Sequence, residues 1–153
     1  MDYKINVGEL KREIAGVAYV VADVSEGKET SHTLHQTYDI CEGGNEDRVD
    51  RLLRLGVAEA GVAIAAIGGV SIKEEYIRLR VVRGVPLSVA VKVREVLREY
   101  LTAAVLWGWL TVTLPGSAGV WGERKEALLG ELGAAAGTVM TGAAGFCRRV
   151  PPL

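Results

Sequence analysis

Apolar residues recur at three- and four-residue spacing over four stretches of the chain, which is the spacing of one face of an α-helix. The stretches cover residues 7 to about 20, 45 to 67, 86 to 109 and 117 to 141. Asn6 and Glu9 have the spacing of an N-cap and its capping-box partner at the start of the first. The apolar residues that recur in the first, second and fourth stretches are Leu10, Ile14, Val17 and Val21; Val49, Leu52, Leu53, Val57, Ala60, Ile64 and Ile67; and Val120, Trp121, Leu128, Leu132, Ala135 and Val139. In the third stretch we predict that Val89, Val93, Val96, Leu97, Leu101 and Val105 face inward.

The period changes to strict alternation between the second and third helices, which is typical of a half-buried strand. Gly68 and Gly69 precede this region in the position of a helix C-cap, and Gly84 ends it before Pro86 opens the next helix. The expected fold is therefore mainly α, a four-helix bundle with a small β element between its second and third helices. The alternating residues are Ile77, Leu79 and Val81 with Arg78, Arg80 and Val82.

Two segments lack a clear period. Residues 23–44 contain many turn formers and predict a long loop after the first helix, of a length that often serves interaction. Residues 142–153 end in a basic and proline-containing sequence and predict an extended C-terminal arm. We therefore divide the chain into a helical domain at 1–141 and an arm at 142–153.

Composition adds one constraint on function. Hydrophobic residues make up 49% of the 153 residues, yet only one is Phe, so the apolar residues are mostly small or branched. This is more apolar surface than a polar-coated monomer needs, and it indicates that the protein packs against something. The formal net charge of -1 argues against a protein that coats nucleic acid and against an acidic disordered tail.

An uncharged stretch between Glu99 and Glu123 raises the possibility of a membrane helix. Its apolar part stops at Pro115-Gly116 after about fifteen residues, and a membrane span needs about 20. A buried helix that runs into a turn fits better, although a membrane-associated helical protein that uses residues 100–122 stays an alternative. The N-terminus lacks the basic and apolar regions of a secretory signal.

His32, His35 and Cys41 are the candidates for metal binding, with Cys147 or Asp39 as a fourth ligand. Their spacing matches neither a helical histidine pair nor a paired-cysteine motif, so solvated loop residues are the simpler interpretation. Cys41 or Cys147 as a nucleophile also lacks a supporting motif. We expect no enzyme, no metal and no cofactor, and a reducing compartment. A small metal- or ligand-binding α+β protein that uses this loop stays an alternative.

Glycines in the last helix and arginines around the β element suggest contacts rather than chemistry. Each interior glycine costs a helix about 0.5–1 kcal/mol relative to alanine, so close packing within or between subunits has to offset it. The glycine-rich runs lack the Lys-Ser/Thr of a phosphate loop. The arginines are suited either to pairing with carboxylates on a partner or to keeping the protein soluble. The residues concerned are Gly130, Gly133, Gly137 and Gly142, and Arg78, Arg80, Arg83, Arg148 and Arg149.

The order of these elements resembles the head–tail connector (neck adaptor, or head-completion) proteins of tailed bacteriophages and prophages, particularly those of Bacteroides-type hosts. The resemblance rests on a capped first helix, a long loop, a helix opened by acidic residues, a β segment, and a proline-started helix. It continues with a final Ala-rich helix and a basic-proline tail. The matching stretches are Asn45–Leu53, Trp107-Gly108-Trp109 and Phe146–Pro152. This chain is poorer in Phe and Tyr, and richer in Gly and Ala, than such proteins.

The resemblance implies a structural virion protein of the phage neck, assembled in the host cytoplasm. It would form a ring, commonly a dodecamer, that joins the portal to the tail and extends the DNA channel, which DNA meets only in passing. Other neck or tail proteins would be further partners, and no membrane would be involved. On this sequence it implies a portal-docking tail with Phe146, Arg148, Arg149 and Pro151, subunit contacts through Trp107, Trp109, Trp121, Gly133 and Gly137, and a loop facing the channel or the next ring with Lys28, His32 and His35.

Overall fold

The computed structural model describes residues 1–24, 39–40 and 43–147, with the backbone alone for residues 140–147. Within these ranges the chain is mainly helical, with a small antiparallel sheet, as the sequence predicts. The β element between the second and third helices is confirmed. The elements are β1 (Asp2–Asn6), α1 (Val7–Val24), a short 3-10 turn η1 (Gly43–Asn45), α3 (Glu46–Ala63), β2 (Gly68–Ile72), β3 (Tyr76–Val81), α4 (Leu87–Thr113) and α5 (Pro115–Cys147).

The β element is a hairpin of β2 and β3, and β1 pairs with its other side, so the strand order is β1-β3-β2. Strand β1 escaped the sequence analysis because it is short and buries only Ile5 fully. Its partners lie 70 or more residues away, with Lys4 opposite Arg78 and Ile5 opposite Ile77. Only this long-range pairing makes the first residues a strand.

Helix caps agree with the sequence in one case and differ in another. The backbone N–H of Glu9 donates to Asn6 Oδ1 at 2.9 Å, which confirms the N-cap of α1. The expected C-cap at Gly68 is wrong, because α3 ends at Ala63 and Gly68 opens β2. A Cβ on Gly68 would lie 1.9 Å from the carbonyl oxygen of Arg80, so close approach of two strands explains this glycine.

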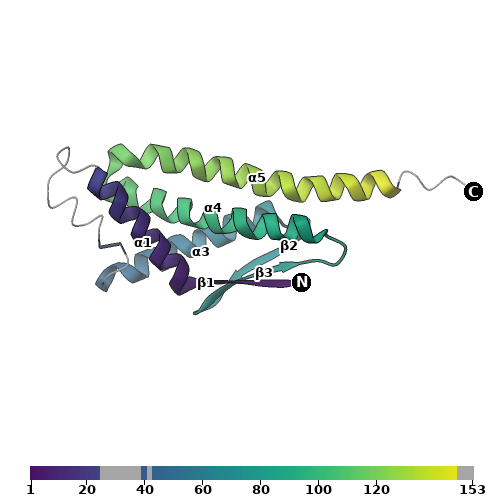
Figure 1. Cartoon of the computed structure of the whole chain (residues 1–153), viewed down its shortest axis with the longest axis horizontal. Coiled ribbons are helices and arrows are strands. Elements are labelled where there is room, and N and C mark those ends of the chain that lie inside the picture. Colours follow the sequence, from purple (N-terminus) through teal and green to yellow (C-terminus); the bar gives the residue numbers. More distant parts are fainter. Residues whose placement is uncertain (25–38, 41–42, 148–153) are drawn as a thin grey trace, which may run out of the picture.

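Helix α4 is central to the packing. It contacts α1, α3 and α5, and α5 runs back along it as the second arm of a long hairpin (Figure 1). The sheet packs below the hairpin, near the start of α4. Buried residues line most of α4, namely Ala90, Val93, Val96, Leu97, Tyr100, Leu101, Ala103, Ala104, Val105, Leu106, Trp109, Leu110 and Thr113.

The last helix is longer than the sequence indicates. Helix α5 starts at Pro115 and continues to Cys147, which at 1.5 Å per residue is about 50 Å. Residues 142–147 are therefore helical, and the expected extended arm is wrong for this part. Phe146 lies in the last turn of α5, whereas Arg148, Arg149 and Pro151 fall outside the described residues.

Candidate functional site

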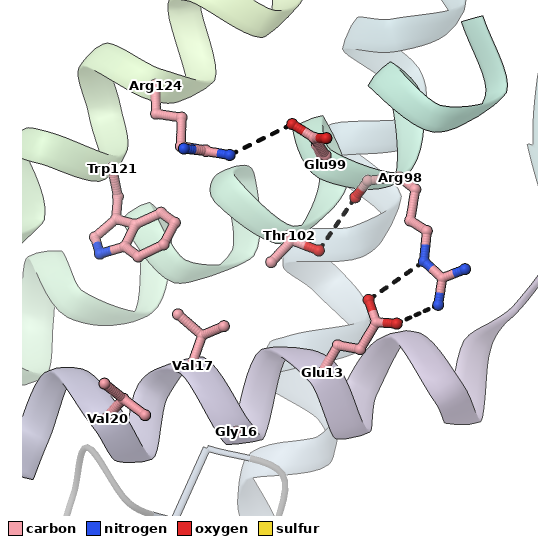
Figure 2. A pocket seen from close by; sticks show the side chains of 9 residues that line it. All are labelled: Glu13, Gly16, Val17, Val20, Arg98, Glu99, Thr102, Trp121 and Arg124. Atoms are coloured by element: carbon pink, nitrogen blue, oxygen red, sulfur yellow. Dashed lines mark hydrogen bonds and ion pairs between the residues drawn. The ribbon is translucent and has the colours of Figure 1, made fainter. Parts of the chain in front are cut away.

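A groove of about 600 Å³ lies between α1, α4 and α5 (Figure 2). Val17 and Val20 of α1 face Trp121 of α5 across it, and Thr102 of α4 lies to one side of them. Gly16 of α1 contributes no side chain to fill it, and a Cβ there would meet nothing within 4 Å. The middle of the groove is therefore apolar and open.

Ion pairs occupy the polar rim of this groove. Arg98 of α4 donates two hydrogen bonds to the carboxylate of Glu13 on α1, and these bonds raise the pKa of Arg98. Arg124 Nη2 of α5 lies 3.4 Å from Glu99 Oε2 of α4. Both carboxylates of the rim, Glu13 and Glu99, therefore lie in ion pairs. An apolar side chain is the occupant that the groove suits best.

Exposed apolar side chains occur in the last turns of α4, the first turns of α5 and the last turns of α1, at or near the end of the molecule where α4 turns into α5. The last part of α1 reaches this same end (Figure 1). Large exposed apolar surface of this kind commonly marks an interaction site. We call this surface the apolar end, and its residues are Tyr19, Val20, Trp107, Val112 and Val120.

A polar cluster joins α3, α4 and α5. The hydroxyl of Tyr100 donates a 2.6 Å hydrogen bond to Glu59 Oε2, and Lys125 Nζ lies 3.1 Å from the same oxygen. Lys125 Nζ also lies 4.6 Å from the ring centre of Trp107, a favourable cation–π position. No motif in the sequence indicates this cluster, because its members are 25 or more residues apart and only folding unites them.

This cluster has a structural rather than a catalytic character. Tyr100 is fully buried and Lys125 is 8% exposed, so neither is accessible to a substrate. Burial and the bond to Glu59 raise the pKa of Tyr100, which keeps the phenol protonated. The Tyr100 bond and Lys125 lower the pKa of Glu59 and keep it charged.

The three tryptophans predicted for subunit contacts differ in how exposed they are. Trp107 and Trp121 lie partly exposed at or beside the apolar end. Trp109 is 2% exposed, with its ring under the guanidinium of Arg48 at 5.2 Å, so it belongs to the core of its own chain. This corrects the expectation for Trp109.

The glycines predicted for subunit contacts have open space at the position of a Cβ within the described part of the chain. A Cβ on Gly130, Gly133 or Gly137 would meet no other atom within 4 Å. The close approaches inside the described chain occur at other glycines, among them Gly108 against Leu52. The prediction that Gly133 and Gly137 contact a neighbouring subunit stays a prediction.

The proposed loop site lies mostly outside the described residues, including Lys28, His32, His35 and Cys41. Asp39 is described, and its carbonyl accepts a hydrogen bond from Asn45 Nδ2. Within the described ranges, no three His, Cys, Asp or Glu side chains lie close enough to hold a metal ion. Over the same residues, no helix has the length and apolar character of a membrane span.

Comparison with known proteins gives no relative. No protein family, no curated protein and no solved structure matches the chain.

Proposed function

We propose that the chain is a structural subunit that assembles with its own copies into a ring, in the manner of the phage neck proteins that it resembles. The observation that carries this proposal is the apolar end together with the adjoining groove around Trp121. These surfaces adjoin on α1 and α5, and Val20, Val112 and Val120 in them are more than half exposed.

The form of the molecule supports a repeated contact. The apolar end lies at one extreme of the α4–α5 hairpin, and the last turns of α5 lie at the other (Figure 1). A contact between two different surfaces of identical subunits repeats from copy to copy and closes into a ring when the rotation allows. The proposed position is the neck of a tailed phage, between portal and tail, where a subunit needs contacts and no chemistry.

Mass photometry and negative-stain imaging of the full chain test this proposal. We expect closed rings of uniform size, alone or after mixing with the portal protein of the same phage. Immunogold labelling at the neck of purified virions would support the proposed position. A chain that stays monomeric at tens of micromolar, alone and with portal, would overturn the proposal.

Two matched variants test the contact surface. Val120→Glu changes a 70% exposed residue of the apolar end, and Val62→Glu changes an 80% exposed residue of α3. Both put the same charge on an exposed helical position, so both should fold. We expect V120E to abolish rings and V62E to keep them. Equal assembly of the two variants would exclude the apolar end as the contact.

The two alternative functions, a metal- or ligand-binding loop and a membrane-associated helix, have separate tests. Metal analysis of the purified chain addresses binding at His32, His35 and Cys41, and stoichiometric metal would favour that alternative. Recovery in a detergent-free supernatant addresses a membrane role for residues 100–122. Quantitative recovery there would exclude the membrane role.

A further inference from the structure

The outer face of the sheet is strongly basic. Residues Ile77 and Leu79 of β3 are buried, so Arg78 and Arg80 between them lie on the opposite face, because successive side chains alternate along a strand. Lys4 of β1 is opposite Arg78 and shares this face. The net charge of -1 for the whole chain therefore conceals a local excess of positive charge.

The only carboxylate that the strands place on this face is Asp2, and it lies to one side. Asp2 of β1 pairs with Arg78 and, at 3.4 Å through Nε, with Arg80. The two terminal nitrogens of the Arg80 guanidinium have no carboxylate partner in the described part of the chain, and the Arg80 side chain is 66% exposed. The pairing with Asp2 thus leaves much of the positive charge of the face unneutralised.

On the other side, β2 opposes these arginines with small residues. Ser71 is the partner of Arg78 and Gly69 is the partner of Arg80. A Cβ on Gly69 would meet nothing within 4 Å. A shallow hollow of about 260 Å³ follows, lined by Gly69, Val70, Ser71, Lys73, Arg78 and Arg80.

We propose that this hollow and the surrounding sheet face bind the phosphate backbone of nucleic acid. Arg78, Arg80, Lys73 and Ser71 line this hollow, and their guanidinium, ammonium and hydroxyl groups are types that donate hydrogen bonds to phosphate oxygens. The contact depends on charge rather than on base sequence, so it is weak and sensitive to salt.

The face suits phosphate better than an acidic protein surface. Stable protein interfaces rely on a buried core of aromatic and apolar side chains. The aromatic side chain of this face is Tyr76, and Lys4 Nζ covers its ring at 4.5 Å from the centre. Phosphate binding needs no such apolar core, because release of counterions supplies the free energy.

Fluorescence anisotropy with a labelled 20-base-pair DNA duplex of mixed sequence tests the proposal with the full chain. Neutralising about three phosphates predicts an affinity loss of about 40-fold between 50 and 200 mM salt. We expect the double variant Lys73→Gln, Arg80→Gln to bind at least 10-fold more weakly at 50 mM salt. The control Lys92→Gln, Arg51→Gln removes the same two charges from exposed positions of α4 and α3 and should bind within twofold of wild type.

Three results would overturn the proposal. They are no binding at 50 mM salt, equal weakening by both double variants, and tighter binding of polyglutamate than of DNA with the same dependence on Lys73 and Arg80. The last result would assign the face to an acidic protein. Ring formation is measured separately by mass, so this proposal and the proposed function fail independently.

Discussion

Tyr100 on α4 donates a 2.6 Å hydrogen bond to the carboxylate of Glu59 on α3, 41 residues earlier in the chain. Lys125 of α5 completes the contact from the other side, 3.1 Å from the same carboxylate oxygen. One polar cluster therefore fixes the relative positions of three helices. Polar groups in a packed region restrict the arrangement, because any other register leaves a buried donor without a partner.

Removal of the phenol oxygen should destabilise the fold. Tyr100→Phe leaves the ring in the core and deletes the bond to Glu59, which is partly exposed and can recruit water instead. We expect a loss of about 1–2 kcal/mol in the free energy of unfolding, near the lower end for a bond to a charged group. Urea denaturation measures this loss, and the dependence of the free energy of unfolding on urea concentration should stay unchanged. Tyr76→Phe, in the sheet, should change stability by less than about 0.5 kcal/mol, and a similar loss in both variants would contradict the prediction.

The same contact predicts a dependence of stability on acid. The hydrogen bond from Tyr100, followed by Lys125, lowers the pKa of Glu59 in the folded chain below the ordinary 4.5. Glu59 therefore contributes stability that is present above pH 4.5 and is lost as the pH falls through the lowered pKa. In Glu59→Gln this part of the pH dependence should disappear. Urea denaturation between pH 3 and 7 would refute the prediction if both proteins lost stability in parallel.

Alkaline pH should act through Tyr100. Burial, and then the bond to Glu59, raises its pKa in the folded chain above the ordinary 10. An unfolded tyrosine ionises near pH 10 while the folded one stays protonated, so stability falls as the pH rises above 10. Tyr100→Phe should lose less stability than wild type between pH 9 and 11. Equal losses in the two proteins would show that another group controls the transition.

The helices were predictable because their signal is local. Stripes such as Leu10, Ile14 and Val17 repeat within each helix, and the cap at Asn6 lies beside the first of them. The sheet was only partly predictable, since β1 becomes a strand through pairing with residues 70 or more positions away. The end of α5 was misjudged for a different reason. Its Gly142-Ala143-Ala144-Gly145 sequence has little apolar contrast, so no period indicates that the helix continues.

The candidate surface was less predictable than the fold. The sequence showed an excess of apolar residues and predicted Trp107, Trp109 and Trp121 alike for subunit contacts, but it could not show that Trp109 is buried while Trp107 and Trp121 are partly exposed. Trp107 and Trp109 lie on different sides of α4, because Trp107 packs against Gly122 of α5 and Trp109 against Arg48 of α3. The basic sheet face depends likewise on the register of three strands, which brings Lys4 and Ser71 to either side of Arg78.

Two neighbouring glycines of β2 should respond very differently to alanine. A Cβ on Gly68 would lie 1.9 Å from the backbone oxygen of Arg80, and backbone atoms cannot move aside cheaply. We expect Gly68→Ala to cost about 3 kcal/mol or more, or to prevent folding. Gly69→Ala meets open space and should change stability by less than about 0.5 kcal/mol. Circular dichroism and urea denaturation of both variants check this, and a tolerated Gly68→Ala would contradict the strand pairing.

Gly119 and Gly122 of α5 offer the sharpest comparison on the α4–α5 hairpin. Alanine favours a helix over glycine by about 0.5–1 kcal/mol, and at Gly119 a Cβ meets nothing, so Gly119→Ala should stabilise the chain by about that amount. A Cβ on Gly122 would lie 2.9 Å from the Trp107 ring and would displace it from Lys125. Crowding of this kind costs about 1–3 kcal/mol, which exceeds the helical gain, so Gly122→Ala should destabilise the chain and alter its tryptophan fluorescence. Stabilisation by both substitutions would mean that Trp107 is free to move, and that it does not hold Lys125 against Glu59.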